Sequence, residues 1–185
     1  ELARELGIEV VSLSLLLDGK EYINYLDGRE IGFKEFYDAI REGKTATTSA
    51  ANIATFKEAM KAIVDQGKDV LYIGFSSGLS ATVGAGTNAA RELSEECPDS
   101  KIYAVDTLGA SLGQGMIVYY AAKKKAEGAS IEEVRDFVES RKLNQAHWFT
   151  VDDLNHLKRG GRISPATAAI GTMLNIKPVM HMDNE

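Results

Sequence analysis

Short apolar runs alternate along the chain with longer segments in which apolar residues recur every three or four positions. The runs are rich in aliphatic and aromatic residues and predict strands over residues 8–17, 69–75, 101–105, 147–151 and 176–182. The helical spacing predicts helices over residues 33–42, 53–66, 80–96, 110–127, 130–141, 152–158 and 164–174. This alternation is typical of βαβ units, so we expect an α/β fold with a parallel sheet flanked by helices.

Local signals support several of these elements. Residues 69–75 form a nearly continuous apolar run, which predicts a strand buried on both faces of the sheet. Ser130 and Glu133 have the spacing of a capping box, which predicts a helix start. Ser164 and Pro165 supply an N-cap and a first-turn proline for the helix that follows.

The chain is predicted to contain one α/β domain over residues 1–145 and the start of a second, incomplete α/β domain over residues 146–185. A Gly160-Gly161 pair is the strongest local sign of a change of domain. The sequence begins at Glu1 without an initiator Met, and it ends on a predicted strand, which would leave a sheet unfinished. We therefore expect a piece that lacks both ends of its protein.

Composition narrows the class of protein. The 185 residues carry 21 Lys and Arg against 27 Asp and Glu, a net charge of −6. This balance argues against a generic binder of nucleic acid, because such binders need a basic surface. Cys97 is the single cysteine, so the chain has no internal disulfide and no cysteine-based zinc site. No apolar run approaches the ~18 residues of a membrane span, and no basic segment precedes an apolar one as in a secretory signal. A cytoplasmic protein is expected.

Hydroxyl side chains gather where predicted strands give way to helices. In open α/β sheets, ligands bind beyond the carboxyl ends of the strands, next to helix N-termini. One cluster lies in residues 45–49, a second lies in residues 76–82, and Arg162 with Ser164 forms a third. Neutral O–H donors, backbone N–H groups and a guanidinium suit a carboxylate or a phosphate. The candidate ligand-binding residues are Thr48, Ser49, Ser76, Ser77, Ser80 and Arg162.

The same residues allow two other interpretations. Ser and Thr before helices are commonly N-caps, although the turn at residues 76–82 holds more hydroxyls than one cap needs. The segment Gly74-Phe75-Ser76-Ser77-Gly78 matches the G-x-S-x-G pattern of serine hydrolases. A hydrolase would use Ser76 as nucleophile and Asp106 as acid, with one of the three histidines as base. Those histidines are His147, His156 and His181.

Phosphate-loop and metal sites have less support. No Lys occurs between Asp69 and Lys101, so the Walker A pattern is absent from the turn after the most apolar strand. Residues 84–89 match G-x-G-x-x-A, but they lie inside a predicted helix, where close helix packing explains the glycines better. Acidic residues with one histidine over residues 152–156 are those of a solvated first helical turn. We expect no metal and no cofactor.

Segments along nearly the whole chain, in matching order and spacing, resemble the bacterial DegV family. The most specific are Gly-Gly-Arg-Ile-Ser at residues 160–164 and Leu-Asn-Ile-Lys-Pro at residues 174–178. The other matching segments are residues 1–11, 18–22, Thr48-Ser49, 76–80 and Val105-Asp106-Thr107 with Ser111 and Gly113.

The resemblance implies both a fold and a function. DegV-like proteins bind one long-chain fatty acid in a tunnel between two α/β domains, and some are the binding subunit of bacterial fatty acid kinase. By resemblance, Thr48 and Ser80 hydrogen-bond the carboxylate, and Arg162 lies close to it. The surrounding donors would be Ser49, Ser76 and Ser77. The chain departs from the family at Ala81, where glycine is usual, and at residues 50–53, which lack the prolines of the usual turn.

The leading hypothesis is therefore a non-enzymatic carrier. It would hold one long-chain fatty acid by its carboxylate and present it to a separate fatty acid kinase for acyl-phosphate formation, with transient membrane contact. Burial of a C16 tail would contribute on the order of 10 kcal/mol at ~0.8 kcal/mol per CH₂. The buried head-group then needs hydrogen-bond donors, because burial of a charged group without hydrogen bonds is unfavourable. Acyl length, kinase partner and oligomeric state are left open by the sequence.

Overall fold

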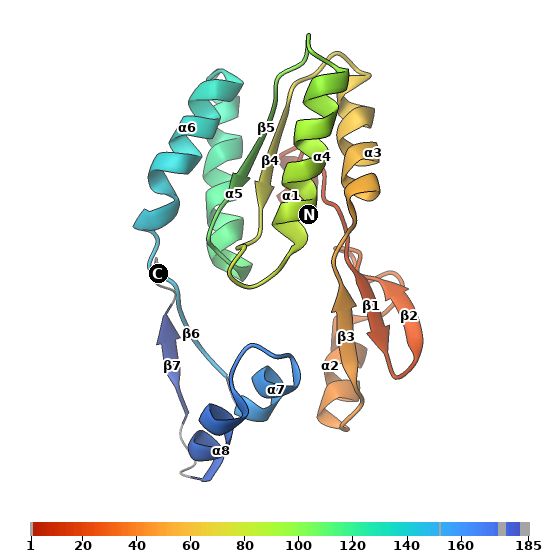
Figure 1. The fold of residues 1–185 in the computed structure, drawn as a ribbon, viewed down its shortest axis with the longest axis vertical. Coiled ribbons are helices and arrows are strands. Elements are labelled where there is room, and N and C mark those ends of the chain that lie inside the picture. Colours follow the sequence, from red (N-terminus) through yellow and green to blue (C-terminus); the bar gives the residue numbers. More distant parts are fainter. Residues whose placement is uncertain (1, 152, 174–176, 182–185) are drawn as a thin grey trace.

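The computed structural model describes residues 2–151, 153–173 and 177–181 (Figure 1). The helices are α1 (Leu2–Glu5), α2 (Phe33–Arg41), α3 (Ile53–Val64), α4 (Thr82–Glu96), α5 (Ser111–Ala126), α6 (Ile131–Arg141), the 3-10 turn η1 (Lys142–Asn144), α7 (Leu154–Arg159) and α8 (Pro165–Met173). The strands are β1 (Ser14–Leu17), β2 (Lys20–Ile23), β3 (Ala46–Ser49), β4 (Val70–Gly74), β5 (Ile102–Asp106), β6 (Trp148–Thr150) and β7 (Val179–His181).

A parallel pair of strands forms the middle of three layers. β4 and β5 pair in register from Val70 opposite Ile102 to Gly74 opposite Asp106, and α4 makes the crossover between them. In Figure 1, α3 and α4 lie on one side of this pair, and α5 and α6 lie on the other. The βαβ unit and the helix-flanked parallel strands agree with the sequence-based prediction.

The strands are buried on both faces because successive side chains point to opposite sides. Val70 and Ile102 pack in one cluster with Phe56 of α3 and Leu93 of α4. The other face supplies Val105, which packs with a second cluster. The buried members of that cluster are Val105, Ile117, Ala121, Val134 and Val138. The near-continuous apolar run over residues 69–75 thus has the two-faced burial that its composition predicts.

An antiparallel sheet in the order β2-β1-β3 forms a separate part with α2. Its own cluster of buried residues contains Leu15, Leu17, Ile31 and Ala39. Two predictions are wrong here. The strand predicted over residues 8–17 is confined to β1, and the hydroxyl-rich residues 45–49, predicted as a strand-to-helix turn, include the strand β3. Backbone pairing with β1 holds β3 in place, with Thr48 opposite Leu15. Most residues of β3 are polar, so the hydrophobic pattern of the sequence does not indicate a strand there.

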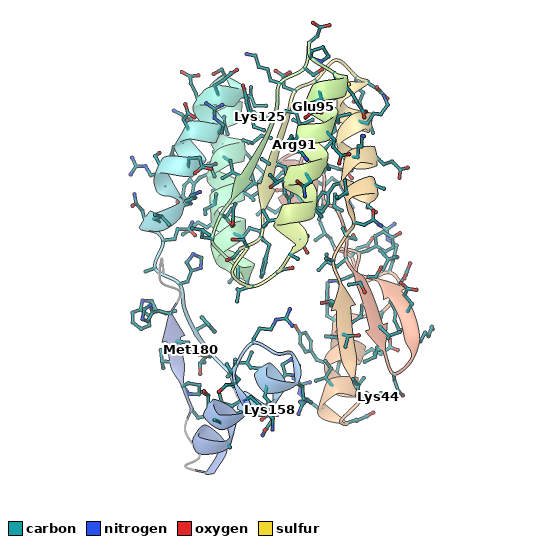
Figure 2. All side chains as sticks on the ribbon, in the orientation of Figure 1. Lys44, Arg91, Glu95, Lys125, Lys158 and Met180 are labelled. Atoms are coloured by element: carbon teal, nitrogen blue, oxygen red, sulfur yellow. The ribbon has the colours of Figure 1, made fainter. Side chains whose placement is uncertain are left out.

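The last elements form a small third part. β6 and β7 pair antiparallel, α7 and α8 pack on each other, and Lys158 and Met180 mark this part in Figure 2. Ser164 caps α8 as predicted, because its Oγ accepts the N–H of Thr167 at 3.1 Å. Residues 152, 174–176 and 182, where other predicted bounds fall, lie outside the described residues. A domain boundary between residues 145 and 146 stays a prediction.

The capping box at α6 has the geometry that the sequence predicts. Ser130 Oγ accepts the N–H of Glu133 at 3.2 Å, and the Glu133 carboxylate accepts the N–H of Ser130 at 2.7 Å. We expect Ser130→Ala to lower the free energy of unfolding by about 1 kcal/mol, because a donor of the first turn loses its acceptor. Denaturant unfolding would measure the loss. Ser130→Thr keeps the acceptor, so an equal loss in that variant would contradict capping as the cause.

Candidate functional site

The turn after β4 is held by its own backbone and by the loop after β5. Ser76 is 2% exposed, its N–H donates to the Gly109 carbonyl at 2.9 Å, and its Oγ accepts the N–H of Gly78 at 3.2 Å. Its carbonyl accepts the N–H groups of Leu79 and Ser80, each at 3.1 Å. The buried Ser76 therefore holds the turn together through hydrogen bonds of its backbone and its hydroxyl.

Ser80 lies at the entrance to α4. Its Oγ lies 2.9 Å from Thr82 Oγ1 and accepts the N–H of Thr82 at 3.2 Å. The helix begins at Thr82, two residues later than predicted, because Ser80 and Ala81 complete the turn. Ala81 is the N-cap and makes no side-chain hydrogen bond, so it satisfies none of the free N–H groups of the first helical turn. Hydroxyl and N–H groups thus share this end of α4, an arrangement that suits an anion.

The loop after β5 fastens the turn in place. The Asp106 carboxylate accepts the N–H of Ser77 at 3.3 Å and that of Leu108 at 2.9 Å. Thr107 is fully buried; its Oγ1 donates to the Gly74 carbonyl at 2.7 Å and accepts the N–H of Gly109 at 3.2 Å. Asp106 is predicted as a hydrolase acid, and both residues belong to a segment that resembles the DegV family, but neither is predicted to hold this turn. The available signal was their position at the end of the neighbouring parallel strand.

Two residues of this loop have strained backbones. Leu108 has φ 50° and Ser111 has φ 51°, both in the left-handed region that side chains other than glycine rarely adopt. Such conformations cost about 1–3 kcal/mol each and persist where the surroundings hold them. Leu108 directly precedes Gly109, whose carbonyl orients Ser76, and Ser111 follows Gly109 by two residues. The strain is therefore concentrated at the contact between the two loops.

A tyrosine near this edge of the sheet stays protonated. Burial, together with the nearby negative charge of Asp106, raises the pKa of Tyr72 to about 12. Its hydroxyl is consequently neutral at physiological pH. Within residues 2–151, 153–173 and 177–181, no group of three or more His, Cys, Asp or Glu side chains could hold a metal ion. The donors described at this edge are hydroxyls and backbone N–H groups.

The structure brings together only part of the predicted set. Ser76, Ser77 and Ser80 share one turn, whereas Thr48 and Ser49 are exposed on β3. Arg162 is exposed in the connection between α7 and α8, where its Nη1 donates to the Gly160 carbonyl, and no carboxylate among the described residues pairs with it. No hydrogen bond between described residues joins Thr48, Ser80 and Arg162. Their shared role stays a prediction.

The hydrolase arrangement finds little support in this geometry. Ser76 is buried, and its Oγ accepts the Gly78 N–H. The Asp106 carboxylate is occupied by two backbone N–H groups. Among the hydrogen bonds between described residues, none connects an imidazole to either side chain. A serine nucleophile needs both an adjacent base and access to substrate.

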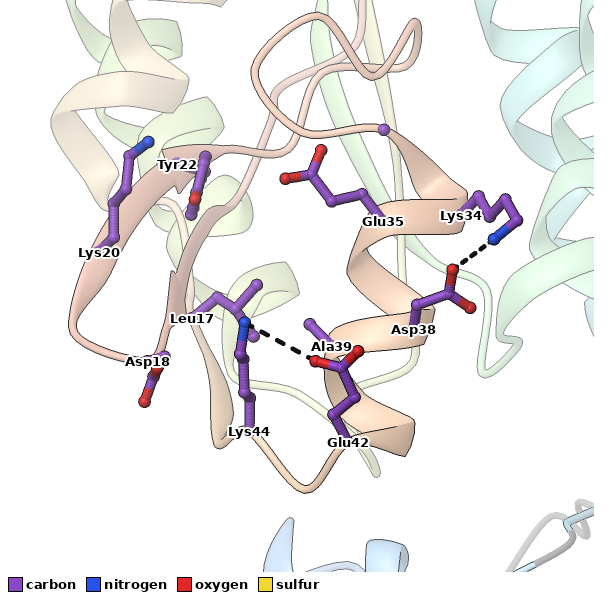
Figure 3. A pocket seen from close by; sticks show the side chains of 11 residues that line it. Leu17, Asp18, Lys20, Tyr22, Lys34, Glu35, Asp38, Ala39, Glu42 and Lys44 are labelled. Atoms are coloured by element: carbon purple, nitrogen blue, oxygen red, sulfur yellow. Dashed lines mark hydrogen bonds and ion pairs between the residues drawn. The ribbon is translucent and has the colours of Figure 1, made fainter.

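A cavity of about 730 Å³ lies elsewhere, between the β1–β2 hairpin and α2 (Figure 3). Its walls carry charges of both signs, and several neutralise one another. Lys34 Nζ lies 2.5 Å from an Asp38 oxygen, and Lys44 Nζ lies 4.0 Å from Glu42 Oε2. None of the predicted ligand-binding residues lines it. We assign this cavity no part in the candidate site.

The family model for DegV matches residues 1–185. The chain belongs to the DegV family. A DegV domain-containing protein of Clostridium perfringens is 45% identical over 183 residues, which make up 99% of this chain and 62% of that relative.

Solved DegV structures share the fold. A fatty-acid-binding DegV family protein from Thermus thermophilus is 35% identical with a TM-score of 0.83, over 98% of this chain and 62% of that protein. DegV from Bacillus subtilis, a fatty acid binding protein, is 28% identical with a TM-score of 0.79, over 99% of this chain and 63% of that protein. The resemblance and the α/β fold class are thus confirmed. This DegV chain spans 62% of the length of both the Clostridium perfringens relative and the Thermus thermophilus protein.

Proposed function

We propose that this chain is part of a fatty-acid-binding protein. The observation that carries the proposal is the turn of residues 76–80, with its hydroxyl and N–H donors at the carboxyl end of β4, in a chain of the DegV family. Related DegV proteins from Thermus thermophilus and Bacillus subtilis bind fatty acids. We propose that Thr48 and Ser80 bind the carboxylate and that Arg162 lies close to it. Ser49, Ser76 and Ser77 would complete the set of donors.

The donors suit a carboxylate held at the end of a buried tail. Most of the binding free energy would come from the acyl chain, at about 0.8 kcal/mol for each buried CH₂. The head-group must then keep hydrogen-bond partners as water leaves it. The Ser80 hydroxyl and the first turn of α4 can supply neutral donors. Arg162 has no carboxylate partner among the described residues, so its guanidinium can face an anion.

We propose that the bound acid is presented to a separate fatty acid kinase, which forms the acyl phosphate. A kinase must hold the transferred phosphates, and this chain has no Lys between Asp69 and Lys101 for a Walker A loop. We propose that the partner binds the phosphoryl donor and that this chain acts as the carrier. We also propose a cytoplasmic location, where ATP-dependent kinases act. The structure has, among the described residues, no helix that is long and apolar enough to cross a membrane.

Thr48→Ala and Ser80→Ala are each expected to weaken binding of a C16 fatty acid about tenfold, because each removes a hydrogen bond to a charged group worth about 1.5 kcal/mol. Calorimetric titration of the complete, delipidated protein would measure both affinities. Thr47→Ala is the matched control, since Thr47 is also exposed but faces the other side of β3. Ser140→Ala removes a hydroxyl remote from the turn, one that donates to the Phe137 carbonyl.

Two results would contradict the proposal. One is a delipidated protein that takes up no C14–C18 acid, and the other is unchanged affinity in both the Thr48 and Ser80 variants. A fluorophosphonate probe, which labels activated serine nucleophiles, separates the hydrolase alternative. We expect no labelling of Ser76, whereas labelling without fatty acid uptake would favour a hydrolase.

A further inference from the structure

His147 lies immediately before β6, and its imidazole occupies a space lined by two glycines at the start of α5. A Cβ added to Gly113 would overlap the ring, with Nε2 only 3.0 Å away. A Cβ added to Gly109 would lie 3.2 Å from Cε1 and 3.5 Å from Nε2. Neither glycine has a positive φ, so the backbone does not require glycine at these two positions. The space that the ring takes explains Gly113, and a side chain at Gly109 would crowd the same ring.

Gly109 is one hydrogen bond away from the hydroxyl-bearing turn. Its carbonyl accepts the N–H of Ser76 at 2.9 Å, and its own N–H donates to Thr107 Oγ1 at 3.2 Å. The Ser76 carbonyl in turn accepts the N–H of Ser80. A shift of Gly109 would therefore move the acceptor that orients the first residue of the turn. The path from His147 to Ser80 runs through one packing contact and two backbone hydrogen bonds.

The loop after β5, against which the His147 ring packs, needs contacts with other segments to keep its conformation. Leu108 and Ser111 hold left-handed conformations on either side of Gly109, and such residues relax when their surroundings loosen. The His147 ring comes from a segment more than thirty residues away in the sequence. It fills the notch between Gly109 and Gly113, so it limits the room into which this loop could relax.

His147 also belongs to the part of the chain that carries Arg162. β6 pairs with β7, α7 packs on α8, and His147 directly precedes β6 in the segment that continues into these elements. Its contact with Gly109 and Gly113 therefore ties this part to the layer that carries Ser80. Among the donors proposed for the head-group, those of residues 76–80 and Arg162, in the stretch after β6, thus lie in two segments of the chain, and the His147 contact links the start of the second segment to the loop beside the first.

We propose that His147 is a positioning residue. Its ring, lying between Gly109 and Gly113, sets the conformation of residues 76–80 and places the segment that carries Arg162 relative to them. The consequence for ligand affinity rests on the proposed function, whereas the coupling between His147 and the turn does not.

Gly113→Ala tests the coupling in the complete, ligand-free protein, with Gly115→Ala as its matched control. Both add one methyl group to α5, but a Cβ on Gly115 meets nothing within 4 Å. We expect amide hydrogen exchange of residues 76–80 to rise at least tenfold in Gly113→Ala and in His147→Ala, and to stay unchanged in Gly115→Ala. His147→Ala removes atoms rather than adding them, so it carries the same test if Gly113→Ala fails to fold.

Trp148 gives a second signal next to the contact between His147 and the two glycines. It is the single tryptophan of the chain, it follows His147 directly, and its ring lies 5.3 Å from that of His181. We expect its emission spectrum to change in Gly113→Ala and to stay unchanged in Gly115→Ala. The double variant Gly113→Ala/His147→Ala should be no worse than His147→Ala alone, because the added methyl then meets no ring.

Fatty acid affinity separates this proposal from the proposed function. We expect Gly113→Ala and His147→Ala to weaken C16 binding about tenfold and Gly115→Ala to leave it unchanged. Unchanged exchange at residues 76–80 in both the Gly113 and His147 variants would overturn the positioning role, whatever the affinity. Wild-type protein that binds no fatty acid, with faster exchange in those variants, would overturn the proposed function and support the positioning role.

Discussion

Gly86→Ala is expected to lower the free energy of unfolding by about 2 kcal/mol. A Cβ on Gly86 would overlap the Tyr72 ring, with Cζ only 2.6 Å away. That ring lies edge-on to Phe56 at 5.0 Å between centroids, in the cluster between the helices and β4. Overpacking of such a site costs about 1–3 kcal/mol, more than the ~1 kcal/mol that alanine gains over glycine in a helix.

Gly84→Ala is the control two residues away on the same helix. A Cβ on Gly84 meets nothing within 4 Å, so this variant should be stabilised by about 0.5–1 kcal/mol through helix propensity. Denaturant unfolding of both variants measures the difference. Equal effects at Gly84 and Gly86 would show that the contact with Tyr72 is not what requires glycine. The prediction that close packing explains the glycines of residues 84–89 is confirmed for Gly86 and wrong for Gly84, where an added Cβ meets nothing within 4 Å.

Thr107→Val is expected to lower the free energy of unfolding by about 2 kcal/mol and, under the proposed function, to weaken fatty acid binding as well. Valine has nearly the same shape, so the change removes the hydroxyl and little else. The Gly109 N–H then loses its acceptor inside the protein, and an unsatisfied buried donor costs about 1–3 kcal/mol. The Gly74 carbonyl keeps the N–H of Thr107 at 3.2 Å, so the damage falls mainly on the loop after β5.

Thr107→Ser separates the hydroxyl from the methyl group. It keeps the donor to Gly74 and the acceptor for Gly109, and it loses only a buried methyl group. Thermal unfolding and C16 titration of the two variants provide the comparison. If serine proves as damaging as valine in both measurements, the methyl group rather than the hydrogen bonds holds the two loops together.

The elements with a strong apolar period could be predicted from the sequence, because tertiary contacts reinforce their local pattern. The helix predicted over residues 53–66 is α3, and the capping box at Ser130 marks the start of α6. The strand β3 could not be predicted, because Thr47 and Thr48 are both exposed and the strand exists through its pairing with β1. Residues 8–13 have a strand-like composition and no strand partner among the described residues.

The residues of the candidate site also fall into those that the sequence predicts and those that it does not. Ser76, Ser77 and Ser80 are close in the sequence, so one turn brings them together and the pattern alone could reveal it. The roles of Thr107 and Gly109 depend on which strand lies beside β4, and a single sequence does not state strand order. The contact of His147 with Gly113 depends on the placement of two distant segments, for which local periodicity holds no information. Arg162 stays a prediction.

The three clusters of buried apolar residues share no member. Two of them lie on opposite faces of the β4–β5 pair and the third lies between the β2-β1-β3 sheet and α2, so substitutions that reshape one cluster need not repack another. Such substitutions can leave the hydrogen-bonded loops at the ends of β4 and β5 as they are. Under the proposed function, repacking of the apolar clusters and recognition of the head-group would then evolve separately.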